Sequence, residues 1–383
     1  MKCSSCGGTM VYDVAKKGLV CDHCGAVQPL PKPEESSGAG TADFNPAVKE
    51  DVSDWGSARN LVTCDSCGAQ LFIDSDQMSG LCPFCGSAVV LTLQEAKCGL
   101  APSAIIPFSI TREQVTEKFY RWNKFAFWSP ESFRKGKILG NLTPVYVPYW
   151  TFDADTVTTY SGRFGYTTGS GEDEKINWYQ RTGTVEKHIE GACVCGSKKF
   201  RNDKLLNSVI SFSTKDLVAY TPDALSGMAA EKYTVGIDEA WEVAKNTELN
   251  SRVTNAARAK ENADRYSDLK ISTEYSNIKY RYVLVPVWLT GCKYGGKVYN
   301  VVASGHNWKG NCSRPFSVAK LITFLSIFFV LFVVTSIFGL GGVFLGLGVM
   351  AMLVAFIIYM AMFMSTLSEQ RQQERKMSEG QTE

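Results

Sequence analysis

The chain has 383 residues and nearly balanced charge, with 40 Lys and Arg residues against 38 Asp and Glu residues. This balance argues against a generally basic nucleic-acid-binding protein. Of the 13 cysteines, eight form four C-x2-C pairs near the amino terminus. This count excludes a simple one-domain enzyme and a disordered chain.

The first predicted element is a rubredoxin-like zinc ribbon over residues 1–28. Its ligands are two C-x2-C pairs that are fourteen residues apart, Cys3, Cys6, Cys21 and Cys24. A glycine follows each pair and permits the positive φ at which backbone N–H groups approach the sulfurs. Four thiolates at this spacing complete a closed tetrahedral zinc site. Disulfide pairing is the alternative, but it needs an oxidising compartment, and the amino terminus has no apolar signal segment.

Residues 29–58 have the proline-, glycine- and serine-rich composition of a flexible linker, so the flanking segments are expected to move independently. Phe44 and Trp55 in this linker are either docking anchors or incidental packing residues. Residues 1–99 hold 7 basic and 12 acidic side chains, which is a poor surface for phosphate groups. Protein contact or a purely structural role is therefore expected here.

A second ribbon is predicted over residues 59–97, and it repeats the first at an offset of 61 residues. Its ligands are Cys64, Cys67, Cys82 and Cys85. We expect two structural zinc ions in all, with iron as the minor alternative in a four-thiolate site. A segment this short cannot bury a sufficient core, so the metal must supply much of its folding energy.

Residues 98–316 are predicted to form an α+β cytosolic domain. A capping box at Thr111-Arg-Glu-Gln114 begins a helix that we expect to reach Trp128. A second helix is expected over residues 238–265, where Asp238 is the expected N-cap. Two segments share the pattern V-x-V-P-x-W, at 145–150 and 283–288. We interpret them as equivalent edge strands, because an edge tolerates proline; chance similarity is the alternative.

The domain shows no recognisable catalytic or nucleotide site. The segment Gly291–Lys297 resembles a phosphate loop, but Val298 stands where Ser or Thr would hold Mg²⁺. His188 and His306 do not belong to a recognisable constellation with a nucleophile and a carboxylate, so a hydrolase is not indicated. Five cysteines lack ribbon spacing, and their roles stay open: Cys98, Cys193, Cys195, Cys292 and Cys312. Cys193 and Cys195 can join a metal site, but buried thiols are the preferred interpretation.

The carboxyl-terminal region 317–367 is predicted to form a two-helix transmembrane hairpin. Residues 321–368 contain no charged side chain, and this stretch is too long for one span. Glycines at 339–342 predict a break, which gives spans 321–338 and 343–364. Basic residues flank both spans. The sequence thus predicts an inner-membrane protein whose amino terminus and tail, 368–383, are both cytoplasmic.

Paired ribbons, the two Val-Pro-x-Trp strands and a terminal apolar hairpin together resemble a bacterial family of zinc-ribbon membrane proteins. Its members are often labelled primosomal-helicase-like or replication-restart-like. The resemblance implies a role beside SPFH (flotillin-like) and phage-shock-type membrane-stress proteins. The helicase label does not suit this chain, because two motor domains do not fit into residues 98–316.

The expected function is that of a non-enzymatic, membrane-anchored adaptor that recruits protein partners, with the lipid bilayer as a further contact. The middle domain carries a net charge of +7, which favours contact with anionic lipid, although a merely solvated surface is an equal alternative. A nucleic-acid-binding or helicase-associated factor is the alternative function. Nucleotide binding is not expected.

Overall fold

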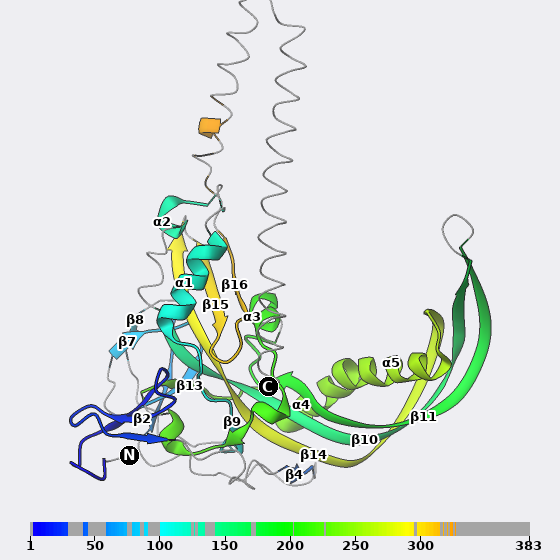
Figure 1. The fold of residues 1–383 in the computed structure, drawn as a ribbon, viewed down its shortest axis with the longest axis horizontal. Coiled ribbons are helices and arrows are strands. Elements are labelled where there is room, and N and C mark those ends of the chain that lie inside the picture. The colour runs from blue at the N-terminus through cyan, green and yellow to red at the C-terminus, as the bar shows by residue number, and fades with distance from the viewer. Residues whose placement is uncertain are drawn as a thin grey trace, which may run out of the picture.

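The computed structural model consists mainly of β-strands, with one eleven-stranded sheet at its centre (Figure 1). The residues that it describes are 3–29, 41–44, 59–74, 79–84, 88–90, 100–123, 126, 129–134, 142–169, 174–201, 203–225, 227–294, 297–314, 317, 320, 322–324 and 326. The predicted α+β class of the middle domain is corrected to a mostly β architecture. The expectation was wrong because three strands there are 21 to 30 residues long.

The first cysteine region, ribbon 1, forms its own three-stranded antiparallel sheet. The strands pair in chain order and are β1 (Met10–Asp13), β2 (Gly18–Cys21) and β3 (Val27–Pro29). Met10, Tyr12 and Leu19 are buried in a core cluster that they share with the main domain. The Tyr12 hydroxyl also donates a hydrogen bond to the Phe108 carbonyl at 3.0 Å. Ribbon 1 is therefore docked on the domain by side chains.

The second cysteine region, ribbon 2, joins the main sheet instead. Its strands are β5 (Arg59–Thr63), β6 (Gln70–Asp74), β7 (Ser79–Leu81) and β8 (Ala88–Val90). Strands β6 to β8 occupy the positions of β1 to β3 shifted by the repeat offset. However, β6 pairs with β5 and with β13 of the main sheet, while β7 pairs with β8. Ribbon 2 is thus docked through backbone hydrogen bonds.

The main sheet runs in the order β12-β9-β14-β10-β13-β6-β5, with the other strands attached to β10, β14 and β15. Its remaining strands are β4 (Ala42–Asp43), β9 (Ala104–Ile105), β10 (Thr143–Thr168), β11 (Lys175–Cys195), β12 (Val218–Ala219), β13 (Ala229–Glu231), β14 (Arg265–Tyr294), β15 (Lys297–Ser304) and β16 (Gly310–Cys312). The expected linker contributes β4, which pairs with β14. Next to it, the Phe44 ring packs against Trp241 at a centroid distance of 5.7 Å, so it serves as an anchor; Trp55 lies outside the described residues.

The helical segments are short and lie on the sheet. They are α1 (Arg112–Asn123), α2 (Glu131–Arg134), α3 (Lys204–Val209), η3 (Thr214–Asp216), η4 (Pro222–Leu225), α4 (Ile237–Ala244), the π-helical turn η5 (Lys245–Leu249) and α5 (Asn250–Glu261). The predicted capping box is present, since the Gln114 side chain accepts from the Thr111 N–H at 2.8 Å. Helix α1 ends at Asn123, earlier than expected. Gly236, two residues before Asp238, is the N-cap of α4.

The two V-x-V-P-x-W segments are equivalent parts of a duplicated unit. Each begins with a valine that pairs in parallel with a short strand, and the pairs are Val145 with Ala229 of β13 and Val283 with Ala104 of β9. Each short strand leads into a helix, α4 after β13 and α1 after β9. The tryptophans match as well, because Trp150 donates to the Val235 carbonyl at 2.9 Å and Trp288 donates to Ile110 at 2.8 Å. The two halves therefore share one plan.

These segments are not edge strands, because β10 and β14 are neighbours in the middle of the sheet. The prolines are tolerated for a different reason. The Pro148 and Pro286 carbonyls accept hydrogen bonds from the N–H groups of Gly196 and Gly305, at 2.8 and 2.9 Å. At its proline each strand changes its neighbour on one side. Strand β10 pairs with β13 before Pro148 and with β11 after it, and β14 pairs with β9 before Pro286 and with β15 after it. The backbone nitrogen of each proline, which has no N–H, points to the side on which the neighbouring strand changes. No hydrogen bond between strands is lost there.

Strands β10, β11 and β14 extend beyond the core as a long curved sheet (Figure 1). We call its outer part, residues 155–168, 175–188 and 265–276, the sheet arm. Helix α5 lies along one face of the arm. There, Ala257 is buried with Tyr160 and Phe164, and the Tyr160 hydroxyl donates to the Glu261 carboxylate at 2.5 Å. The opposite face of the arm carries alternating exposed side chains.

The predicted transmembrane hairpin is corrected. Within the described part of the chain, no helix is long and apolar enough to cross a membrane. The expectation rested on hydropathy over residues 321–338 and 343–364, and of these only residues 322–324 and 326 are described. The inner-membrane location with two cytoplasmic termini is corrected with it, because that location depended on the two spans.

Candidate metal centre

The four cysteines of ribbon 1 come together as the repeat predicts. The Sγ atoms of Cys3, Cys6, Cys21 and Cys24 all lie within 4.8 Å of one another. The Cys3–Cys24 and Cys6–Cys21 sulfur pairs are 3.6 and 3.4 Å apart. A tetrahedron with metal–sulfur bonds of about 2.3 Å has sulfur–sulfur edges of about 3.8 Å, whereas a disulfide bond is about 2.05 Å long. The arrangement fits a metal ion, and all four cysteines are free.

The backbone around these sulfurs explains why a glycine follows each pair. Gly7 has a φ of 73°, and its N–H donates to the Cys3 carbonyl at 2.9 Å to close the turn. The turn directs the Ser5 N–H at the Cys3 sulfur, at 3.4 Å. A side chain at Gly8 would place its Cβ 3.0 Å from the Cys21 sulfur. Glycine is therefore required at position 7 for its positive φ and at position 8 because a side chain there would crowd the Cys21 sulfur.

The same N–H groups favour the thiolate form. Hydrogen bonds from the Ser5 and Cys6 N–H groups lower the pKa of the Cys3 thiol to about 6. The N–H of Cys24 lowers the pKa of Cys21 in the same way. At Cys6, the lowering by the Gly8 N–H is outweighed by the neighbouring sulfurs, which raise the pKa to about 12. Without a cation the four sulfurs retain protons among them, and a bound metal ion takes the place of those protons.

Ribbon 2 repeats this geometry at three of its four predicted ligands. The sulfurs of Cys64, Cys67 and Cys82 lie within 4.8 Å of one another, and those of Cys67 and Cys82 are 3.7 Å apart. Gly68 has a φ of 70° and donates to the Cys64 carbonyl at 2.7 Å, as Gly7 does in ribbon 1. Cys85, the fourth predicted ligand, lies outside the described residues. Each cysteine group can thus hold a metal ion.

A lysine from the main domain completes the surroundings of ribbon 2. The Lys199 ammonium lies 3.0 Å from the Cys67 sulfur and 4.8 Å from the centre of the Phe84 ring. Phe84 in turn packs on Phe200 at a ring distance of 4.8 Å. An ammonium here offsets part of the negative charge of a thiolate cluster. The sequence did not reveal this contact, because Lys199 is 132 residues from Cys67.

The cysteines without ribbon spacing do not form a third cluster among the described residues. Cys193 donates to the Gly191 carbonyl at 3.2 Å, and burial raises its pKa to about 12. Burial likewise raises the pKa of Cys195 to about 11 and that of Cys312 above its usual value. These three are protonated thiols at neutral pH. Cys98 and the side chain of Cys292 lie outside the described part of the structure.

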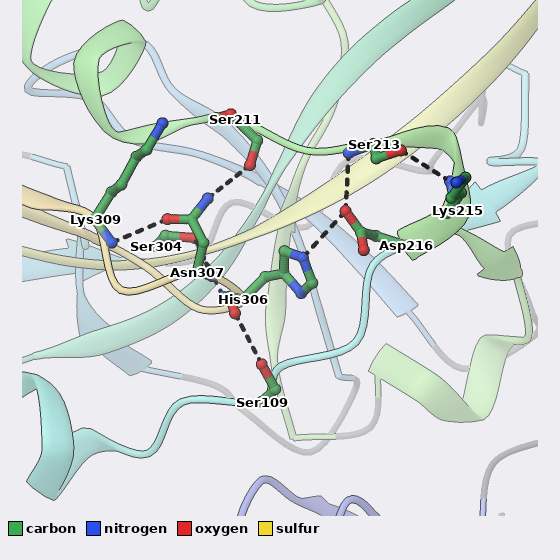
Figure 2. A network of polar contacts seen from close by, with 9 residues as sticks. All are labelled: Ser109, Ser211, Ser213, Lys215, Asp216, Ser304, His306, Asn307 and Lys309. Carbon is green, nitrogen blue, oxygen red and sulfur yellow. Dashed lines mark hydrogen bonds and ion pairs between the residues drawn. The ribbon is translucent and has the colours of Figure 1, made fainter. Parts of the chain in front are cut away.

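Both histidines considered as catalytic candidates do have a carboxylate partner, contrary to the sequence expectation. His188 Nδ1 lies 2.6 Å from Asp155 Oδ1 on the exposed arm. Figure 2 shows the His306 ring pointing toward Asp216, with Nε2 and Oδ2 3.3 Å apart. The Ser109 hydroxyl donates to the His306 backbone carbonyl, not to its ring, so it is not activated as a nucleophile.

The network of Figure 2 instead holds two loops together. The Asn307 amide donates to the Ser211 carbonyl at 2.6 Å, and Asp216 accepts from the Ser213 N–H at 2.8 Å. Sequence reasoning missed the Asn307–Ser211 and His306–Asp216 pairs, because one member of each precedes β12 and the other follows β15. The contacts give these polar side chains a structural role.

The chain is similar to the uncharacterized protein YdjG of Bacillus subtilis (strain 168). The two are 23% identical over 335 residues, which cover 85% of this chain and 92% of the relative. No family model and no solved structure matches the chain. The likeness therefore supplies no activity or ligand, and the family resemblance stays a prediction.

Proposed function

We propose that this protein is a zinc-ribbon adaptor without enzymatic activity. In this proposal two structural zinc ions hold the ribbons, and the sheet arm binds a protein partner. The observation that carries it is the closed set of four sulfurs in ribbon 1. Four protein ligands leave no coordination position for a substrate, which is typical of structural zinc and not of catalytic zinc.

Zinc is proposed because thiolates are soft ligands and the sulfur spacing suits tetrahedral coordination. Cys85 would supply the fourth ligand of ribbon 2. Zinc would supply folding energy at both sites and take no part in a reaction. The backbone N–H groups and Lys199 would stabilise the thiolates around it.

The sheet arm supports the partner-binding half of the proposal. Trp178 is 37% exposed on one face of the arm, while Tyr179 of β11, which is 50% exposed, and Tyr266 of β14, beyond β10, are exposed on the other face. Arg163 stacks over the Trp178 ring at 5.7 Å, and Arg181 stacks over Tyr179 at 5.6 Å. Exposed aromatic and arginine side chains are the types that dominate binding energy at protein interfaces. The resemblance noted above favours an SPFH-type or phage-shock-type protein as the partner.

A photo-crosslinking residue in the full chain tests this proposal. We expect p-benzoylphenylalanine at Trp178 to capture one defined protein in cells. The same residue at Tyr120, which is 45% exposed on α1, is the matched control and should not capture it. Equal capture at both positions, no protein capture at Trp178, or capture of nucleic acid there would contradict the adaptor role.

A further inference from the structure

A cavity of about 570 Å³ lies between the end of β11 and the helical segment formed by α4, η5 and α5. This volume is in the range of small-molecule sites. Two backbone irregularities border it. One is the π-helical turn η5, which contributes Thr247 and Glu248. The other is the register shift of β10 against β11 near Gly191, which has a φ of 65°. Such irregularities are frequent at functional sites.

The duplicated half of the fold contains the same place, but there it is filled. Helices α1 and α4 begin at Arg112 and Ile237, so Trp122 corresponds to Thr247. Likewise, Ser304 corresponds to Cys195. Each precedes a glycine, Gly305 or Gly196, whose N–H donates to the carbonyl of the proline in its half. In the filled half the equivalent void is only about 10 Å³ and is lined by Trp122 and Trp308.

This comparison shows that the fold does not require an open cavity. The Lys118 ammonium lies 5.2 Å from the Trp122 ring centre and 5.8 Å from that of Trp308, so one half is closed by two indoles and a cation. At the corresponding position of the other half, Thr247 leaves the space open. A fold that accepts tryptophan here has no packing need for a cavity of this size, because filling a void with apolar atoms is favourable.

The chemistry of the walls indicates the class of ligand. Arg201 and Arg252 line the cavity together with one carboxylate, Glu248, so the charged lining has a net charge of +1. Arg252 is held by the Glu190 and Gly191 carbonyls at 2.7 and 3.2 Å and lies 3.5 Å from the Glu248 carboxylate, while Arg201 pairs with Glu239 at 2.7 Å. A guanidinium group has five N–H donors, so both arginines retain donors for a ligand.

In the rest of the wall, aromatic and apolar side chains lie beside Asn207, Ser211 and Thr247. The rings of Tyr149 and Phe212 lie edge to face at 5.9 Å, and Ile210 also lines the cavity. We propose that this cavity binds a small organic monocarboxylate, with its carboxylate on Arg201 and Arg252 and its apolar body against Tyr149 and Phe212. A planar carboxylate matches the guanidinium fork. A dianion such as phosphate fits less well, because Glu248 repels the second charge.

The test uses the full chain and a panel of aliphatic and aromatic monocarboxylates, each with its primary amide as the uncharged control. Binding is measured by ligand-observed NMR and calorimetry. We expect members of the panel to bind saturably and their amides to bind at least tenfold more weakly. Equal binding of acid and amide, or no binding by any acid at millimolar concentration, would overturn the proposal.

Three variants locate the site. Thr247→Trp copies the filled half and should reduce binding at least tenfold while the melting temperature is retained. Arg201→Gln should reduce binding severalfold. Asn255→Trp adds an indole to the exposed face of α5 and should leave binding unchanged. Undiminished binding in folded Thr247→Trp would mean that the acids bind elsewhere and would overturn the assignment.

A thiol footprint provides a second readout of occupancy. Cys193 lines the cavity and is partly exposed, whereas Cys312 is a partly buried thiol outside it. Because both thiols are protonated at neutral pH, the alkylation by iodoacetamide is run at alkaline pH, where the thiolate is populated. A bound acid should slow the reaction of Cys193, measured by peptide mass spectrometry, and leave Cys312 unaffected. Equal rates at Cys193 with and without the tightest-binding acid would contradict binding at this place.

Discussion

Ribbon 1 and ribbon 2 have the same cysteine spacing but different strand partners. In ribbon 1, β1 pairs with β2 within a separate three-stranded sheet. In ribbon 2 the equivalent strand, β6, pairs with β5 and with β13 of the main sheet. A repeated cysteine motif therefore has two structural uses here. Ribbon 1 stabilises an attached module, while ribbon 2 stabilises an edge of the central sheet.

The difference follows from what the strands face. Phe72 on β6 is completely buried in the core, whereas Val11 at the equivalent position of β1 is only partly buried. An apolar side chain on both faces of β6 requires cover on both faces, and the main sheet supplies it. Unfolding of ribbon 1 should thus destabilise only ribbon 1, whereas unfolding of ribbon 2 should also destabilise the main sheet.

The largest expected effect comes from removing a ligand. Cys3→Ser and Cys64→Ser are matched, because they occupy equivalent positions of the repeat. Structural zinc contributes about 10–16 kcal/mol in isolated fingers, so either variant should unfold its own ribbon. In hydrogen exchange, Cys3→Ser should expose β1 to β3 alone, while Cys64→Ser should also expose β13 and residues 145–146 of β10. Equal, local exposure in both variants would remove the distinction between the ribbons.

A core substitution sharpens the comparison without touching the metal ligands. Phe72→Ala should lower the free energy of unfolding by about 3–5 kcal/mol, because it leaves a cavity at a fully buried position. Val11→Ala, the matched change in ribbon 1, should cost about 1 kcal/mol. Urea denaturation of the metal-loaded protein measures both. Similar losses would contradict the view that β6 belongs to the main core.

Lys199 should affect ribbon 2 alone. The Lys199→Met variant removes the ammonium beside the Cys67 sulfur and keeps an apolar side chain near Phe84. Outer contacts of this kind change metal affinity by about tenfold or more. Competition with a chelator should show one weakened site and one unchanged site. Two unchanged sites would mean that the lysine is only a surface contact.

The smallest effect is a pH dependence at the junction of β13 and β6. Burial raises the pKa of Glu231 to about 7, although the Ser197 hydroxyl, which donates at 2.7 Å, and the Lys199 charge act in the opposite direction. Because the folded pKa lies above the usual 4.5, this group's stabilisation is complete below pH 4.5 and is lost as the pH rises through 7.

Between pH 6 and 8 the free energy of unfolding should therefore fall by about 1 kcal/mol on account of Glu231. Glu231→Gln keeps the shape of the side chain and should remove this dependence, so that it is the more stable form at pH 8. Urea denaturation at both pH values compares the variant with the unaltered chain. An identical pH slope in the two proteins would show that Glu231 does not titrate in this range.

The sequence was sufficient for features that depend on local spacing. The turn at a cysteine pair follows from the C-x2-C spacing and the glycine after it, and the repeat of this spacing indicated a second group of the same kind. The V-x-V-P-x-W pattern indicated equivalent strands because each copy contains its own packing and hydrogen-bonding residues.

Features that depend on distant partners could not be read in this way. The pairing of Phe72 with Ala230 joins strands that are far apart in the chain, and β6 has no local mark that separates it from β1. The edge position expected for Pro148 was wrong because a central strand can change its neighbour. The cavity depends on the size of one side chain, Thr247, and its significance follows only from a comparison with Trp122 at the equivalent position of the other half.

Metal analysis of the full chain tests the central claim most directly. Purified under reducing conditions, the protein should contain two zinc ions per chain, and Cys3→Ser and Cys64→Ser should each contain one. Fewer than one zinc ion per chain in the unaltered protein, or iron in place of zinc, would contradict the proposed pair of closed zinc sites.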